Sequence, residues 1–563
     1  MNNRVNAAKR GKGRGTGRLR RERAWHLSLA TACLYWAVVP TAGAFEFDTG
    51  NPDFKIRWDN TLKYSTAWRV QGQNNALLVD PNMDDGDRNF NKGLISNRVD
   101  LLSEFDASYR DFGVRVSGAA WYDTVYNRAN DNNSPATANQ TSVANNQFTN
   151  GTRDLSGRKV ELLDAFVHGR VDLGDLPTSF RLGRHTVLYG ETLFFGGNGI
   201  AGAQAPVDII KLLTVPSTQF KELLMPVNQL SGQVQLNSNV SLGAYYQFEW
   251  RANRIPPAGS YLSNADLVGA GAERMFAPGT DGQLYFNRTQ DMEAKNSGQG
   301  GMQLRFRPDS EIAEFGLYAV RYHAKDFQLY LNPAQNPAMP SLGTYQQVYP
   351  EGIVALGASM STTVGGANVA AEISTRRNTP LTSNPTVGIG FDNAGHPAYA
   401  VGNSAHANLS AIYLLDGTPM WNGGSILAEV AWNRMLSVTK NSTALSTTST
   451  RDAVGLRILF APEYYQIFPG IDMTVPIGVG YLASGRSSVD PQFAGGAEHG
   501  GDLSIGFNFD YRKQVKFGIN YVHYFGGAGT YLTPNQSAAN TALQYQQSLK
   551  DRDFVSLSMQ ATF

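Results

Sequence analysis

The 563-residue chain contains a single cysteine, Cys33, which lies in a segment that we expect to be removed. Without it the chain has no disulfide, no thiol chemistry and no cysteine metal site. The histidines are scattered without the spacing that metal ligands need, and the sequence has no glycine-rich phosphate-binding loop. We therefore expect no metal and no cofactor.

Beyond residue 44 the sequence also lacks any apolar run that approaches the ~20 residues of a membrane-spanning helix. A soluble protein of this length would need two or three domains, but no linker or change of composition separates them. The chain is instead rich in Gly (58 residues), Phe (28) and Tyr (25). One large closed sheet, forming a single domain over residues 45–563, accounts for this composition.

Residues 1–44 have the features of an export signal. A basic stretch leads into an apolar run at 25–39, and small residues then precede a cleavage site between Ala44 and Phe45. The Arg/Gly content of the basic stretch suggests nucleic-acid binding, but the apolar run directly after it argues against a nucleic-acid partner. Removal of the signal takes away nine basic residues and one acidic residue, so the formal charge changes from +1 to about −7.

The last eleven residues have one apolar and one polar face. Val555, Leu557, Met559, Ala561 and Phe563 share one side of an extended strand, and polar residues alternate with them. Such an edge strand would invite aggregation in a soluble protein, whereas a membrane barrel needs an apolar outside and a wet inside. A terminal aromatic strand also resembles the signal that Gram-negative outer-membrane proteins present to their insertion machinery. Phe563 is therefore the expected insertion signal.

The same alternation recurs along the chain and is clearest at 54–70. Short turns, such as 110–113 and 512–514, alternate with long polar or Gly-rich connections, as they do in outer-membrane barrels. The segments between these connections number eighteen, within a range of 16–18, and both termini lie in the periplasm. The sequence thus predicts an all-β fold, a transmembrane antiparallel β-barrel with long extracellular loops in the outer membrane of a Gram-negative bacterium.

Alternation places a set of charged side chains inside this barrel, which is too wide for side chains alone to fill. These charges either pair with one another and stiffen the wall, or form a selective pathway for a charged solute. The candidate lumen residues are Arg57, Lys63, Arg98, Asp100, Glu104, Arg115, Arg170, Arg305, Arg376, Glu429 and Arg457.

The connection at 189–228 is unusually apolar for an outer loop. Pro206 is expected to start one short helix, and a second is expected around 218–225. Because apolar loops are rarely left in water, we expect this segment to fold into the barrel as a constriction or plug. Its candidate pore groups are Asp208, Lys211, Lys221 and Glu222. The alternative is an outer cap packed on neighbouring loops.

Two local features carry further expectations. The acidic residues between Asp80 and Asp87 lack the spacing of a calcium loop, so we expect a solvated acidic loop. In residues 178–189, the outward-facing Phe180 and Leu182 would point Arg184 at lipid. We expect a bulge near Gly183, or a position of Arg184 near the rim.

Several motifs resemble a proteobacterial outer-membrane family known as domain of unknown function 1302. They are Asp85-Gly86-Asp87-Arg88-Asn89-Phe90, 97–104, 116–123, 181–185 with Tyr189-Gly190-Glu191, and 206–208 followed by 221–227. The resemblance implies an outer-membrane barrel that works with an inner-membrane exporter of the resistance–nodulation–division (RND) type and a periplasmic lipid-carrier-like protein. It carries over no catalytic residue, and His185 and Tyr189 depart from the expected Gln and Trp.

The main functional hypothesis is therefore a channel that moves a hydrophobic or amphipathic small molecule across the outer membrane. One alternative is a diffusion porin, general or substrate-specific, for polar or organic-acid solutes. Another is a barrel-embedded lipid-modifying enzyme, in which Asp164 and His168 would have to meet a hydroxyl group. A third is a surface adhesin or scaffold, whose lumen would be filled. The expected surroundings are outer-membrane lipid, lipopolysaccharide and the barrel-insertion machinery.

Overall fold

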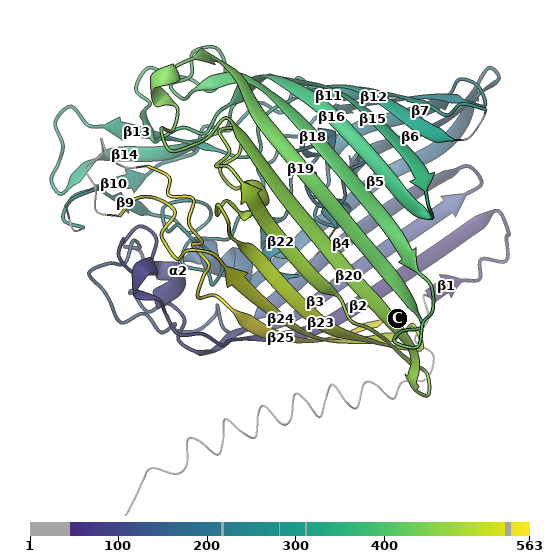
Figure 1. Ribbon diagram of the computed structural model, residues 1–563, viewed down its shortest axis with the longest axis horizontal. Coiled ribbons are helices and arrows are strands. Elements are labelled where there is room, and N and C mark those ends of the chain that lie inside the picture. Colours follow the sequence, from purple (N-terminus) through teal and green to yellow (C-terminus); the bar gives the residue numbers. More distant parts are fainter. Residues whose placement is uncertain (1–44, 216–218, 281, 310–311, 535–541) are drawn as a thin grey trace, which may run out of the picture.

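The computed structural model describes residues 45–215, 219–280, 282–309, 312–534 and 542–563 (Figure 1). The expected signal peptide, with Ala44 on one side of its cleavage site, lies outside these residues. Within them, no helix is long and apolar enough to cross a membrane.

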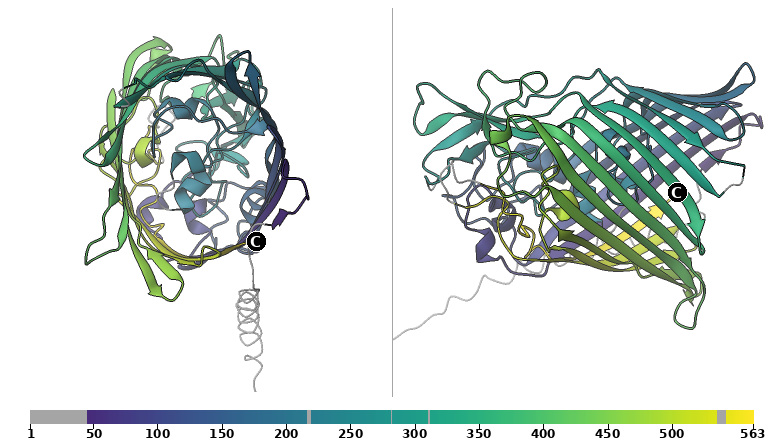
Figure 2. Two further views of the ribbon diagram at one scale, coloured as in Figure 1. Left: turned by 90° about the vertical axis from the view of Figure 1, so that its right-hand side faces the viewer. Right: turned by 45° about the horizontal axis from the view of Figure 1, so that its top comes forward.

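Eighteen antiparallel strands close into a single barrel, which confirms the predicted all-β fold and its strand count (Figures 1 and 2). Short turns connect the strands at one end, the short-turn end, and long loops connect them at the other, the long-loop end. The barrel strands are β2 (Phe54–Arg69), β3 (Gly93–Tyr109), β4 (Phe112–Asp123), β5 (Arg158–Leu173), β6 (Leu176–His185), β7 (Val227–Gln235), β8 (Val240–Gln247), β11 (Gln299–Phe306), β12 (Ala313–Tyr322), β15 (Ile353–Val364), β16 (Ala367–Pro380), β18 (Val401–Leu415), β19 (Gly423–Lys440), β20 (Asp452–Phe468), β21 (Ile471–Thr474), β22 (Ile477–Ser484), β23 (Gly501–Tyr511), β24 (Val515–Phe525) and β25 (Phe554–Thr562).

The segments β21 and β22 are two halves of one strand, because both pair with β20 on one side and with β23 on the other. Pro476 lies in the gap between them, and a proline has no N–H for the ladder. The break therefore leaves the barrel closed.

The first and last strands of the barrel pair with each other. Lys63 of β2 lies opposite Gln560 of β25, and Leu62 lies opposite Ala561. Beyond the end of β25, Asn60 and Phe563 exchange two backbone hydrogen bonds of 2.8 Å. The short β1 (Phe45–Phe47) then pairs with β2 where β25 has ended. The period-two pattern at both ends of the sequence thus closes the cylinder.

Large apolar side chains are exposed on the outside of the barrel. Val430 of β19 is 48% exposed, whereas its neighbours Glu429 and Ala431 are buried. Other large apolar side chains are exposed around the wall, namely Trp58, Leu101, Leu182, Leu317, Ile373, Leu409, Ile458 and Ile519. An apolar outside around a polar inside is the pattern that a membrane barrel requires.

Arg184 lies at the long-loop end of β6, and its Nη1 contacts Glu249 Oε2 at 3.1 Å. The pairing of β6 with β5 and β7 runs through Gly183 without a register shift. Of the two expectations, a bulge or a rim position, the structure thus has the rim position. There the ion pair removes the need to place a bare charge in lipid.

The long loops fold into their own layer over the long-loop end. Part of this layer is a second sheet, made of β9 (Arg274–Phe276), β10 (Tyr285–Arg288), β13 (Gln328–Pro333), β14 (Ser341–Val348) and β17 (Thr386–Val387) (Figure 1). Short helical turns complete it: η1 (Asn75–Leu77), α2 (Asp85–Arg88), α3 (Asn150–Thr152), η2 (Arg153–Gly157), η5 (Ser442–Ala444) and η6 (Phe493–Gly495).

The connection between β6 and β7 takes a different path and enters the barrel, where Figure 2 (left) shows it inside the ring of strands. It contains η3 (Ile200–Ala203), α4 (Ile209–Thr214) and η4 (Phe220–Glu222). We call residues 186–226 the constriction loop. The first predicted helix starts at Ile209 rather than at Pro206, because Asp208 is its N-cap, and the second is a single 3₁₀ turn.

Candidate functional site

Two buried carboxylates hold the first part of the constriction loop against the barrel wall. Glu372 of β16 accepts hydrogen bonds from the backbone N–H of Glu191 at 2.9 Å and of Ile200 at 2.6 Å. Glu429 of β19 accepts hydrogen bonds from three successive amides, those of Leu193 to Phe195, over 2.5–3.2 Å. Backbone donors that would otherwise be unpaired in the lumen are satisfied in this way.

Cationic side chains hold the loop's carbonyl groups. The Nη2 of Arg376 donates to the backbone oxygens of Gly197, Asn198 and Gly199 over 2.7–3.0 Å, and Arg305 forms an ion pair with Glu191. Three predicted lumen residues, Arg305, Arg376 and Glu429, thus hold the constriction loop and do not line the cavity that remains open.

The loop's second part begins with α4. The Asp208 side chain caps this helix by accepting a hydrogen bond from the backbone N–H of Lys211 at 3.0 Å. The second oxygen of Asp208 pairs with Arg254 at 2.8 Å. The ammonium of Lys211 donates to the backbone oxygen of Glu222 at 2.7 Å and so joins α4 to η4.

Between the constriction loop and the opposite wall lies a cavity of about 1010 Å³. Its wall side comes from β2 to β5 and from β23 to β25, with Pro476 beside them, and the loop forms its other side. Of the predicted site residues it brings together Lys63, Arg98, Asp100, Glu104, Asp208, Lys211 and Glu222.

The other predicted residues lie elsewhere. Arg115 is just behind the lining, where it pairs with Glu104 at 2.5 Å. Arg57 pairs with Asp59 at 2.6 Å, and Arg457 pairs with Asp502 at 2.5 Å. Arg170 lies near the short-turn end of β5, and Lys221 is exposed in η4.

The sequence did not indicate three further lining residues. Arg254, in the loop after β8, forms ion pairs with Asp208 and Glu161. The guanidinium carbon of Arg98 lies 4.6 Å from the ring centre of Trp121 in β4. Glu161 could have been found from the alternation in β5. Arg254 has no local signal, because its partners are distant in sequence.

The cavity has an apolar side as well as a charged one. The constriction loop contributes Ile210, Val215, Leu224 and Met225, and the loop after β8 contributes Leu262. Charged groups from the wall and apolar groups from the loops therefore face the same space. This combination fits a molecule with both polar and apolar parts.

The acidic segment at 80–87 is not the solvated loop that we expected, because its carboxylates are buried and paired. Asp87 contacts Arg69 at 2.6 Å and Arg552 at 3.4 Å, and all three side chains are almost fully buried. Burial, and then the charge of Asp266, raises the pKa of Asp84 to about 8 although Arg88 lies 2.5 Å away. Two of its basic partners, Arg69 and Arg88, are near in sequence, whereas Arg552 comes from the far end of the chain.

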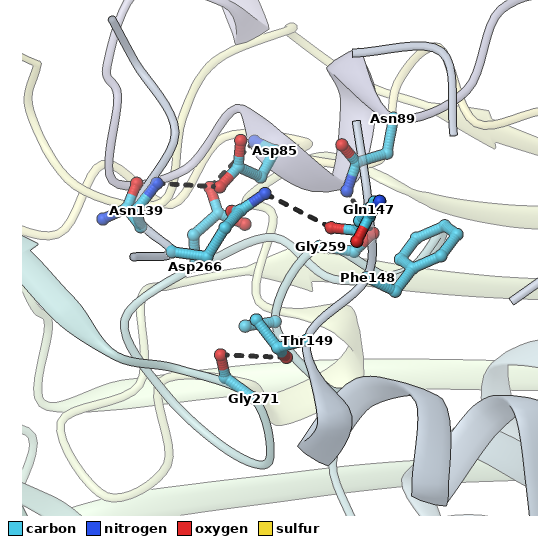
Figure 3. A pocket seen from close by; sticks show the side chains of 11 residues that line it. Asp85, Asn89, Asn139, Gln147, Phe148, Thr149, Gly259, Asp266 and Gly271 are labelled. Carbon is cyan, nitrogen blue, oxygen red and sulfur yellow. Dashed lines mark hydrogen bonds between the residues drawn. The ribbon is translucent and has the colours of Figure 1, made fainter. Parts of the chain in front are cut away.

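Asp85 and Asp266 lie side by side in this loop layer, around a water-sized cavity of about 10 Å³ (Figure 3). The backbone N–H of Asp85 donates to Asp266 Oδ2 at 2.9 Å, and that of Asn139 donates to Asp85 Oδ2 at 3.2 Å. Burial raises the pKa of both carboxyl groups. This cluster joins loops that follow β2, β4 and β8.

The hydrolase hypothesis required Asp164 and His168 to meet a hydroxyl group. Asp164 Oδ2 accepts a hydrogen bond from Ser117 Oγ at 3.3 Å, whereas the ring of His168 lies 5.9 Å from that of Phe166. Among the described residues His168 makes no hydrogen bond with either group. The geometry therefore gives this hypothesis no support.

These features define a large β-barrel with an internal constriction loop and a covered long-loop end. The chain belongs to the family described as Protein of unknown function (DUF1302), whose family model matches residues 25–563. This confirms the family resemblance. No curated protein matches the chain.

Solved structures with a similar fold are outer-membrane proteins at low identity. OccAB1 of Acinetobacter baumannii is 9% identical, with a TM-score of 0.41 over 93% of this chain and 99% of its own. OccAB3 of the same organism is 11% identical, with a TM-score of 0.40 over 90% and 99%. OpdK of Pseudomonas aeruginosa, solved with vanillate, is 10% identical, with a TM-score of 0.39 over 90% and 98%.

Proposed function

We propose that this protein is an outer-membrane channel that passes a hydrophobic or amphipathic small molecule. One observation carries the proposal, namely the cavity of about 1010 Å³ that the constriction loop leaves open along one wall of the barrel. Its apolar and charged sides would bind the two parts of such a molecule weakly at several points, which allows both entry and release. An adhesin or scaffold would need no such space.

The outside of the barrel supports placement in the outer membrane of a Gram-negative bacterium, surrounded by lipid and lipopolysaccharide. Short turns would face the periplasm and long loops the exterior, as in other barrels of this kind. The terminal strand that ends in Phe563 would be the segment that the barrel-insertion machinery reads.

Further partners follow from the family resemblance and belong to the proposal. An RND-type inner-membrane transporter would move the molecule through the inner membrane, and a periplasmic lipid-carrier-like protein would shield its apolar part in the periplasm. In a deletion strain we expect accumulation of a hydrophobic compound to change in the same direction when either the channel or the transporter is lost. Opposite changes would contradict a shared pathway.

The channel itself is tested in planar bilayers with purified protein. We compare wild type with a deletion of 191–225, which removes most of the constriction loop. A measurable conductance that increases on deletion is expected, because the loop fills part of the lumen. If neither protein conducts, the open channel is ruled out.

A diffusion porin for small polar or organic-acid solutes is the second candidate, and the charges at Lys63 and Arg98 favour it. The two candidates differ in their response to apolar chain length. An amphipathic pathway predicts that longer alkyl chains bind more tightly in the lumen, since each buried CH₂ contributes ~0.8 kcal/mol. A polar porin predicts faster permeation by shorter chains and no gain in binding.

A further inference from the structure

Two ammonium groups line the cavity from opposite sides. Lys63 extends from β2 on the barrel wall, and Lys211 extends from α4 on the constriction loop. Both side chains thus face the same space of about 1010 Å³. Like charges repel more strongly in a partly dehydrated lumen than in water, so an anion placed between them would be stabilised by both.

Neither lysine forms an ion pair with a carboxylate among the described residues. Asp100 lies opposite Lys63 in the β2–β3 register, but Arg98 holds it at 2.6 Å. Lys211 donates to a neutral backbone oxygen, that of Glu222. Both charges are therefore available to a solute.

The other cations of the cavity are already paired with carboxylates. Arg254 is shared by Asp208 and Glu161, and Arg115, behind the lining, contacts Glu104. Asp123 is 1% exposed, and its carboxylate already accepts hydrogen bonds from nearby donors, including Ser96 Oγ at 2.6 Å. Asp164 also lines the cavity and contacts Arg115 at 3.6 Å. Glu222 is exposed and forms no ion pair among the described residues, so it is the lining carboxylate that would oppose an anion.

An apolar surface adjoins Lys211 on the same loop. Ile210 precedes it in α4, and Val215 and Leu224 also line the cavity. A chain of several methylene groups would cover these side chains while its head group stays between the lysines. Lysine suits this role, because its ammonium acts as a point charge on a flexible stem.

We infer that Lys63 and Lys211 form an anion subsite, and that the solute is an amphipathic organic acid. Its carboxylate lies between the two ammonium groups, and its alkyl chain lies against Ile210, Val215 and Leu224. This inference rests on the proposed channel function and adds to it the chemical class of the molecule.

The test uses block of single-channel current by two probes of equal length, octanoate and octylammonium. Octanoate is expected to block wild type at a lower concentration than octylammonium. The double variant Lys63→Met/Lys211→Met removes both charge contacts and should need at least about tenfold more octanoate, which corresponds to ~1.4 kcal/mol. Lys221→Met is the matched control, since Lys221 lies on the same loop but does not line the cavity.

Glu222→Gln gives a change in the opposite direction, because it removes the opposing carboxylate. It should lower the octanoate concentration needed for block. Stronger block by octylammonium, or equal octanoate block in wild type and the double lysine variant, would overturn the inference.

A second readout does not depend on conductance. Trp121 lines the cavity, so a brominated octanoate bound there should quench its fluorescence, with Trp121→Phe as the blank. Quenching that is lost in the double lysine variant supports the subsite even in a silent channel, where only the channel proposal fails. Absence of quenching in wild type would overturn the subsite.

Discussion

The carboxylate of Glu429 on the barrel wall accepts a hydrogen bond of 2.5 Å from the backbone N–H of Phe194 in the constriction loop. The same oxygen also accepts from the two flanking amides, and the other oxygen accepts from Asn408 Nδ2 at 2.8 Å. A single wall side chain thus fixes the backbone path of the loop. The position of the loop decides how much of the lumen stays open.

Replacement of Glu429 by Gln is the first prediction. A neutral amide accepts more weakly than a carboxylate, and hydrogen bonds to charged groups contribute ~1.5–3 kcal/mol each. We expect the loop to detach, with larger and noisier single-channel currents and faster proteolysis between 190 and 200. Glu293→Gln, at an exposed loop position, is the control and should behave as wild type. Currents and cleavage equal to wild type in both variants would contradict an anchoring role.

The second prediction concerns the buried network of Asp87 with Arg69 and Arg552. Removing one partner of a buried pair leaves an uncompensated charge and costs ~3–5 kcal/mol. Asp87→Asn should therefore loosen the loop layer while the barrel strands stay protected, as measured by hydrogen exchange.

The matched control for Asp87→Asn is Asp53→Asn, which breaks the exposed 3.0 Å pair with Arg110 at a short turn. Exposed pairs contribute ~0–1 kcal/mol, so loop protection should not change. Equal exchange in the two variants would show that the buried network does not hold the loops.

The strands could be predicted from the sequence because their signal is local. The segment predicted at 54–70 is β2, Phe54–Arg69, and its faces follow from alternation alone. Strand number followed from the rhythm of short and long connections for the same reason. The inward path of the constriction loop was predicted from its apolar composition, which is also a local property.

The contacts of the site could not be predicted in this way. Asp87 and Arg552 are far apart in sequence, so the sequence did not show that the chain end would help to bury the acidic segment. The partners of Glu429 are backbone amides, which carry no side-chain signature. Lys63 and Lys211 were both candidates, but only the fold shows that they line one cavity.

A third prediction follows from the raised pKa of Asp84, at about 8 against its usual 3.8. Between these two values the folded loop binds a proton that the unfolded loop has lost, so its stability falls as pH rises through this range. Loop protection from hydrogen exchange should be greater at pH 5 than at pH 8.5. Asp84→Asn should flatten this dependence, and a pH dependence that stays the same in the variant would rule out Asp84 as its source.

The last prediction tests the membrane-facing surface. Val430 is exposed in the middle of β19, where an arginine in lipid would cost ~2–4 kcal/mol. Phe468 ends β20 at the short-turn end, where the cost falls to ~0–1 kcal/mol. Val430→Arg should lower the free energy of unfolding in lipid vesicles by the larger amount, and Phe468→Arg should leave it nearly unchanged. Equal, small effects at both depths would mean that the apolar outside of the barrel does not face lipid, because only a lipid environment makes the cost of a charge depend on depth.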